Sequence, residues 1–187
     1  MLAHRRSNAP SNEEAITLEG SDAGPRASRP WMPDYGIADA DQGGGLLPWS
    51  WAEERLSAAM RYWVATVWPD GRPHLTPVWG LWLDGLVWFS CASASRKARN
   101  LTANPRCVVS TADPGQPVVV DGLAELVTDQ GELTGFLDRS NAKYSTSYGP
   151  DMIERPRISV WRVRPEVVIG LDEDRFIDSP TRWRFGG

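Results

Sequence analysis

The stretch from Met60 to Ala92, "MRYWVATVWPDGRPHLTPVWGLWLDGLVWFSCA", constrains the fold most, because runs of β-branched and aromatic residues alternate in it with turn signals. The turn signals are the "PDGRP" segment and the Asp84-Gly85 pair. An Asp-Gly pair between hydrophobic runs is the strongest short-range indication of a β-hairpin. Three antiparallel strands are therefore predicted in this stretch.

The same pattern continues further along the chain. The segment "RCVVSTADPGQPVVVDGLAELV" predicts two strands around the turn "DPGQ", and "ISVWRVRPEVVIGLD" predicts one or two more. Helices are predicted at residues 95–103 and near 130–143, and a further short helix is predicted to begin at Ser50 as its N-cap. Six or so strands at hairpin spacing, with short helices between them, indicate a mainly β fold, a small antiparallel barrel.

The first 45 residues differ in composition from the rest. They are rich in Ser, Gly and Pro and carry seven acids against four arginines, so they bury little apolar surface. We expect residues 1–45 to be a mostly disordered acidic arm, in which "RPWMPDYGI" could lie extended on the surface. Residues 46–187 are expected to form one domain.

Charge and cysteine content exclude several classes of protein. The net charge of −4 argues against duplex nucleic acid as a partner. Cys91 and Cys107 lie in hydrophobic runs, which favours buried, reduced thiols over a disulfide framework. The sequence shows neither an apolar signal-peptide core nor a run long enough to span a bilayer. A cytoplasmic protein that does not bind membranes is expected.

The segment "CASASRKARNLTANPR" concentrates positive charge at the start of a predicted helix. Ser95 is a suitable N-cap, so the cations Arg96, Lys97 and Arg99 fall in or next to the first turn. Positive side chains there oppose the helix dipole, and the sequence has no acid from residue 85 to residue 112. Two interpretations remain open on this pattern: a phosphate-binding site, or a solvated basic face paired with distant acids.

The remaining motifs assign no catalytic side chain and no metal site. His4 and His74 are the only histidines, and no zinc spacing, GxSxG motif or P-loop is present. His74 is interpreted as a polar position at the start of a strand rather than as a site residue. Most of the ten tryptophans are expected in the core or at an interface.

The stretch "GRPHLTPVWGLWLDGLVWFSCASASRKARNLTANPR" resembles the flavin-binding split-barrel superfamily, which includes the pyridoxamine 5′-phosphate oxidases and the actinobacterial oxidoreductases that use FMN or F420. The "DGRP" turn, the "TPVW" strand, the "WFS" strand end and "SRKARNL" followed by "NPR" occur in the family's order. The ending "SPTRWRF" is similar to a short C-terminal motif of these proteins. The resemblance implies a six-stranded antiparallel split β-barrel.

The resemblance also implies where a cofactor would bind. The cofactor phosphate would lie on the helix that follows the third strand, the ring system along the backbone of the preceding strand, and the ribityl chain near Ser90 and Cys91. Trp79 is expected to face the pocket. The cofactor-binding residues implied in this way are Thr76, Pro77, Val78, Trp79, Ser90, Ser95, Arg96, Lys97 and Arg99.

The function implied by the resemblance is transfer of hydride between F420 or FMN and a small organic substrate. The "PHLTPVW" strand is closer to the F420-dependent branch than to the arginine-led strand of the vitamin B6 oxidases. The family implies a homodimer with cofactor sites at the subunit interface, where Trp183 and Arg184 would complete the partner's site. The alternatives are a non-catalytic flavin-binding protein, an FMN-dependent oxidase or reductase, and a barrel that binds an acidic protein.

Overall fold

The computed structural model describes residues 24–37 and 44–186 of the chain. It consists of antiparallel strands, three α-helices and two 3₁₀ turns. The elements are β1 (Arg26–Ser28), α1 (Trp49–Ala58), β2 (Tyr62–Val67), β3 (Pro73–Val78), β4 (Gly80–Leu83), β5 (Leu86–Ala92), α2 (Arg96–Ala103), β6 (Arg106–Thr111), β7 (Val118–Leu126), α3 (Gln130–Tyr144), η1 (Pro150–Ile153), β8 (Ile158–Gly170), η2 (Glu173–Arg175) and β9 (Thr181–Arg184).

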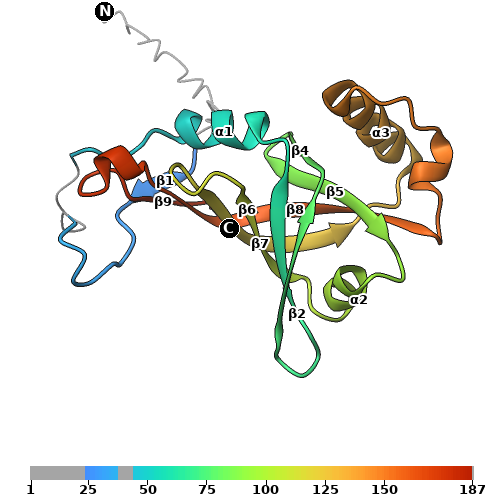
Figure 1. The fold of residues 1–187 in the computed structure, drawn as a ribbon, viewed down its shortest axis with the longest axis horizontal. Helices are drawn as coiled ribbons and strands as arrows, with labels where there is room; N and C mark the ends of the chain where they lie inside the picture. Colours follow the sequence, from blue (N-terminus) through green and yellow to red (C-terminus); the bar gives the residue numbers. More distant parts are fainter. Residues whose placement is uncertain (1–23, 38–43, 187) are drawn as a thin grey trace, which may run out of the picture.

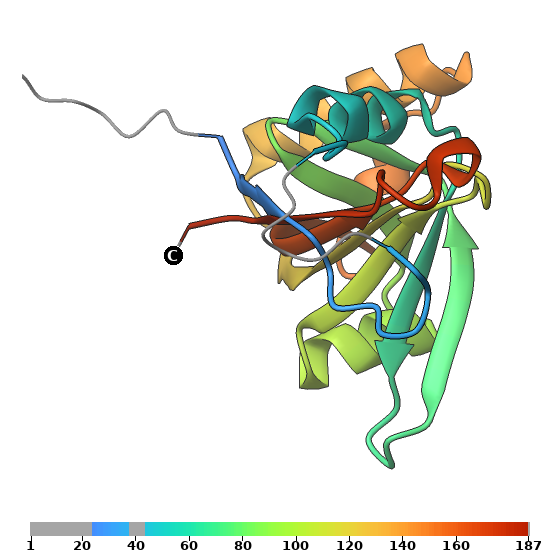
Figure 2. The ribbon, with the colours of Figure 1, turned by 90° about the vertical axis from the view of Figure 1, so that its left-hand side faces the viewer.

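The strands form one antiparallel sheet in the order β1-β9-β8-β7-β6-β2-β3, and β5 joins it at β8 and carries β4. Strand β3 pairs only with β2, so one of its edges has no neighbour among the described strands. Helices α1 and α3 lie on one side of the molecule, and α2 lies on the other beside the long β2–β3 hairpin (Figure 1). The view from the side shows the same separation (Figure 2).

The predicted class, mainly β with short helices in an antiparallel sheet, is confirmed. The predicted number of six strands is not, because the sheet has nine. Strands β1 and β9 extend the sheet beyond β8. They were not predicted because their segments lack a long hydrophobic pattern. In addition, the predicted strand through "HLTPVWGLWL" is interrupted at Trp79, which separates β3 from β4.

Both predicted hairpin turns are present. At the first, the N–H of Trp68 donates to the Arg72 carbonyl and the N–H of Gly71 to the Trp68 carbonyl, each at 2.9 Å. At the second, Asp84 and Gly85 have φ of 51° and 75°. Two consecutive positive φ values are typical of the tight turns that join antiparallel strands.

The helices differ from prediction in one respect. Helix α1 begins at Trp49 after Pro48, without a side-chain cap, so Ser50 lies inside the helix and its prediction as N-cap is wrong. Pro48 is the N-cap and has the extended backbone (φ −67°, ψ 153°) that residues before a helix usually adopt. Helices α2 and α3 occupy the predicted ranges to within a residue.

The core has two parts. The larger lies between α1 and the sheet and includes side chains with no exposed area, such as those of Val64, Phe89 and Val120. The smaller lies under α3, where Phe136 stacks on Trp88 with ring centroids 6.3 Å apart. The apolar face of α3 at Leu133, Phe136 and Leu137 is therefore buried.

Part of the predicted N-terminal arm is described by the structure. Arg26–Ser28 forms β1 against β9, and Arg29, 2% exposed, donates to the carbonyls of Gly44, Asp178 and Pro180. The predicted disorder of residues 1–45 falls largely outside the described residues, and the domain boundary at residue 46 stays a prediction. None of the described helices has the length and apolarity to cross a bilayer.

Gly122 lies at a register shift between β7 and β8. A Cβ atom at this position would lie 2.3 Å from the carbonyl oxygen of Arg164, so the backbone would have to move. We expect Gly122→Ala to lower the free energy of unfolding by about 1 to 3 kcal/mol in urea denaturation. Gly135→Ala is the control, because a Cβ on this α3 residue meets nothing within 4 Å and should stabilise the helix by about 0.5 to 1 kcal/mol. If both substitutions changed the free energy of unfolding by the same amount, the predicted clash at Gly122 would be wrong.

Candidate functional site

Helix α2 begins with a side-chain cap, as predicted. Ser95 Oγ accepts a hydrogen bond from the backbone N–H of Ala98 at 3.3 Å. Ala98 and Leu101 are each 2% exposed, so this face of the helix rests on the core. The Asn100 amide donates to Thr66 Oγ1 at 3.0 Å, which ties the helix to β2. The first turn of α2 therefore has a fixed position.

The basic residues of this segment divide into two groups. Arg106 forms an ion pair with Glu166 at 3.2 Å, although the two are distant in sequence. Arg96, Lys97 and Arg99 form no ion pair with the described residues. The interpretation as a basic face with distant acids therefore holds for Arg106, whereas no described residue neutralises the positive charge at the first turn of α2.

The end of β5 lies next to this first turn. Burial raises the pKa of the Cys91 thiol, and a hydrogen bond with Ser95 and the charge of Lys97 partly oppose the shift. The thiol is thus a near neighbour of both α2 residues, and its raised pKa keeps it protonated at neutral pH. Both cysteines are free, as predicted; Cys107 is buried, whereas Cys91 is only partly buried, so the prediction of two buried thiols is wrong for Cys91.

Strand β3 presents its predicted site residues on two faces. Thr76 and Val78 point inward, whereas Pro77 is exposed on the outer face. Thr76 Oγ1 is buried and has no hydrogen-bond partner among the described residues. A buried hydroxyl without a partner is costly, so an ordered water or a ligand is expected to satisfy it.

A pocket lies between the sheet and α3, and two predicted residues, Trp79 and Ser90, meet in it. It encloses about 60 Å³ and has no Asp, Glu, Lys, Arg or His in its lining. The segment after α3 contributes Thr146 and Tyr148 to the wall. The lining residues are Trp79, Ser90, Phe136, Leu137, Ser140, Tyr144, Thr146, Tyr148, Met152 and Ile153.

The last turn of α3 holds the break between β3 and β4 in place. The Tyr144 hydroxyl accepts from the N–H of Gly80 at 2.8 Å, and its ring stacks on Trp79 with centroids 4.5 Å apart. Lys143 Nζ donates to the carbonyls of Ala59 at 2.7 Å and Gly80 at 3.1 Å, and burial lowers the pKa of this amine. The sequence did not predict a role for Lys143 and Tyr144, because no local signal distinguishes these two residues from an ordinary helix end.

Two further expectations concern His74 and the C-terminal motif. His74 contacts Thr66 Oγ1 through Nδ1 at 3.4 Å and packs edge-on against Trp68, which agrees with a structural position in the hairpin. Trp183 is completely buried, with its ring centroid 5.5 Å from that of Trp49. It therefore cannot reach a partner's pocket, and that expectation is wrong for Trp183, whereas Arg184 is exposed.

Comparison with protein families gives a match over more than half of the chain. Residues 52–172 match the pyridoxamine 5′-phosphate oxidase family. The chain belongs to this family. The matched range includes α2, β3 and the pocket under α3, so the candidate site lies within the part that defines family membership.

Solved structures show the same fold. An F420 reductase is 28% identical with a TM-score of 0.53, over 62% of this chain and 94% of that one. A conserved hypothetical protein from Mycobacterium tuberculosis is 23% identical with a TM-score of 0.62, over 68% and 86% of the two chains. General Stress Protein 26 from Bacillus anthracis is 19% identical with a TM-score of 0.57, over 73% and 97%. Curated proteins gave no match.

Proposed function

We propose that this protein is an oxidoreductase that binds F420 or FMN, with the cofactor phosphate at the first turn of α2 and the ring system along β3. The observation that carries the proposal is the uncompensated charge of Arg96 and Lys97 beside the Ser95 cap. Free backbone N–H groups, a hydroxyl and two cations at a helix start suit a phosphate dianion. Arg99 is a further contact in this proposal.

Strand β3 supports a position for the ring. Its edge away from β2 has no neighbour among the described strands, so backbone N–H and C=O groups there are available to a ligand. The buried Thr76 hydroxyl on the inner face is a free donor and acceptor. These features suit a flat heterocycle with polar edges better than an aliphatic ligand.

Bound F420 or FMN would supply the hydride chemistry, and the protein's part is positioning and exclusion of water. Trp79 is fixed by stacking on Tyr144, and Gly80 is fixed by its hydrogen bonds to the last turn of α3. Trp79 and Ser90 connect the proposed ring site with the pocket under α3, which would receive the second substrate. Because the lining carries no formal charge, an uncharged organic substrate is favoured there.

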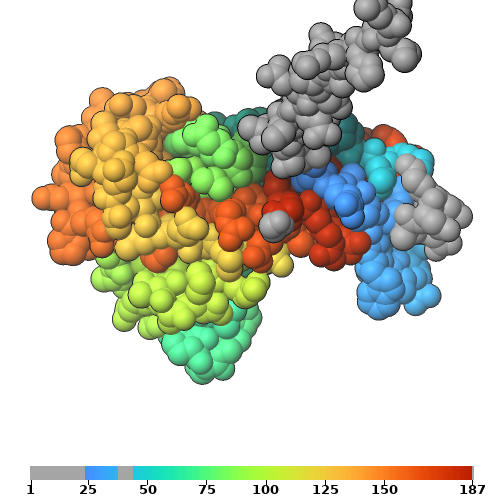
Figure 3. All heavy atoms as spheres, turned by 180° about the vertical axis from the view of Figure 1, so that it is seen from behind, coloured from blue at the N-terminus to red at the C-terminus, as the bar shows by residue number. Residues whose placement is uncertain are grey.

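We also propose that the protein acts as a homodimer. The pocket encloses only about 60 Å³, whereas ligand sites usually span roughly 300 to 1,000 Å³, so a second chain would complete the site. The outer face of the β2–β3 hairpin is apolar, and its Trp63, Val67 and Leu75 are 41%, 41% and 59% exposed. The space-filling view shows the tip of this hairpin as a projection at the bottom (Figure 3).

Fluorescence titration of the cofactor-free protein with F420 and, separately, with FMN tests the proposed function. We expect saturable quenching of tryptophan emission, and the 28% identity with an F420 reductase favours F420 over FMN. Tighter binding of FMN than of F420 would indicate that the protein is an FMN-dependent member of the family. Binding without hydride transfer to any acceptor would support a non-catalytic flavin-binding protein, and binding of neither would favour a protein-interaction role.

A further inference from the structure

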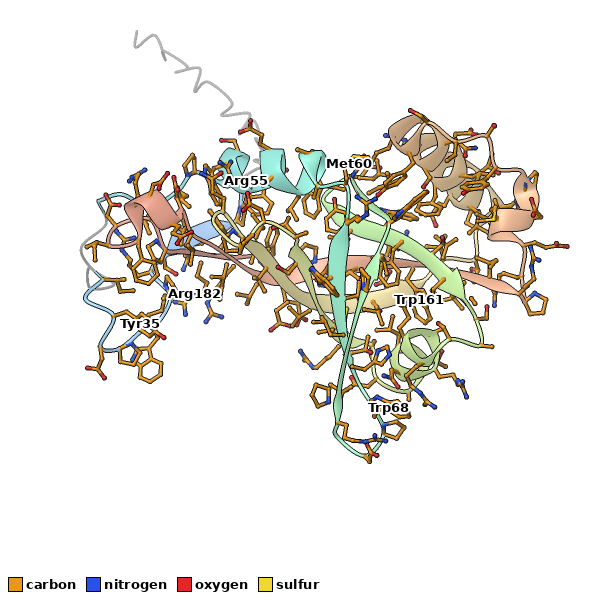
Figure 4. The ribbon with its side chains drawn as sticks, viewed as in Figure 1. Tyr35, Arg55, Met60, Trp68, Trp161 and Arg182 are labelled. Carbon is orange, nitrogen blue, oxygen red and sulfur yellow. The ribbon has the colours of Figure 1, made fainter. Side chains whose placement is uncertain are left out.

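Arg96 is held in place by an aromatic ring and not by an acid. Its Cζ atom lies 3.7 Å from the centroid of the Trp68 ring, within the range of a cation–π contact. The guanidinium forms no ion pair with the described residues. Trp68 lies at the lower end of the molecule beside α2, where the hairpin and the helix approach each other (Figure 4).

Trp68 is itself well fixed. Its N–H and C=O close the β2–β3 turn through hydrogen bonds of 2.9 Å to Arg72 and Gly71. His74 packs against its ring edge-on, with centroids 6.3 Å apart. The bond between Asn100 and Thr66 joins the same hairpin to α2. The indole is therefore a rigid support for the Arg96 side chain.

Arg72 provides an internal comparison. Its Cζ atom also lies near the Trp68 ring, at 4.5 Å from the centroid, but its Nε donates to Asp70 Oδ2 at 2.9 Å. Arg72 is thus paired with a carboxylate, whereas no described acid pairs with Arg96. Of the two guanidinium groups at this indole, only Arg96 retains its full charge for an external anion.

The two ways of holding a guanidinium have different consequences for an anion site. A carboxylate would fix Arg96, but it would also occupy its N–H donors and cancel its charge. An indole face attracts the cation through its quadrupole and leaves the N–H donors free. Because arginine loses side-chain entropy when it binds an anion, a guanidinium that is already oriented binds more strongly.

We infer that Trp68 is a positioning residue that orients Arg96 for the cofactor phosphate without neutralising it. The inference rests on the proposed function, since it requires a phosphate at the first turn of α2. Trp68 acts through Arg96 and does not itself contact the cofactor in this proposal. Its effect on binding should therefore disappear when Arg96 is absent.

A double-mutant cycle on the full chain tests this dependence. The variants are Trp68→Leu, Arg96→Gln and the combination, and affinity is measured by the emission of F420 or FMN, whichever the wild-type protein binds. We expect Trp68→Leu to weaken binding roughly threefold to tenfold, the worth of a cation–π contact. In the Arg96→Gln background the same change should have no further effect. Trp68→Phe, which keeps an aromatic face, should restore part of the affinity.

The control is Trp31→Leu, which makes the same substitution at a tryptophan that is 84% exposed and outside the proposed site. It should bind like the wild-type protein, and thermal unfolding checks that each variant is folded. Two results would overturn the inference while cofactor binding by the wild-type protein stands. One is a double variant whose loss of binding free energy equals the sum of the losses in the two single variants. The other is an unchanged affinity of Trp68→Leu. Failure of the wild-type protein to bind either cofactor would overturn the proposed function, and the inference with it.

Discussion

Replacement of Lys97 by alanine is expected to weaken binding of the phosphate-bearing cofactor by about 1.5 to 3 kcal/mol, the usual worth of a hydrogen bond to a charged group. This corresponds to roughly tenfold to 150-fold in the dissociation constant. Lys97 has no acid partner among the described residues, so its charge is available to the phosphate. The loss should be smaller at high ionic strength, because salt screens the attraction.

The measurement is a titration of wild-type and variant proteins with F420 or FMN at low and high salt. Arg139→Ala is the matched control, because it removes one positive charge from an exposed position on α3, on the other side of the molecule from α2. It should leave the affinity unchanged. If Lys97→Ala binds as tightly as the wild-type protein, the first turn of α2 does not hold the phosphate and the proposed site is wrong.

The parts of the site that the sequence predicted are those that depend on short stretches of chain. The Ser95 cap and the Asp84-Gly85 turn each require only a few consecutive residues, and both occur in the structure. The wrong N-cap at Ser50 is also local: the helix begins one residue before it, at Trp49, and does so without a side-chain cap.

The parts that the sequence could not predict depend on contacts between distant segments. Lys143 reaches the carbonyl of Ala59, 84 residues away in the chain. The burial of Trp183 depends on how α1 packs over β9, which a motif at the C-terminus does not reveal. Whether a charge is neutralised is equally non-local, since Arg106 finds Glu166 whereas Arg96 meets only an indole.

Replacement of Leu75 by glutamate is expected to convert the proposed dimer into monomers. Leu75 is 59% exposed in the single chain, and it pairs with Ala65 on the apolar outer face of the β2–β3 hairpin. In a dimer that uses this face, the new carboxylate would be buried without a partner, at a cost of about 3 kcal/mol or more. The dimer dissociation constant should rise by roughly a hundredfold or more.

Light scattering after size-exclusion chromatography measures this change, and the cofactor titration is repeated on the same samples. Ile177→Glu is the matched control, because Ile177 is 58% exposed and lies near β9, away from the hairpin face. It should remain dimeric and keep its cofactor affinity. A Leu75→Glu protein that stays dimeric would exclude the hairpin face as the interface. A monomer that binds cofactor as tightly as the wild-type dimer would mean that one chain holds the cofactor alone and that the second subunit is not part of the cofactor site.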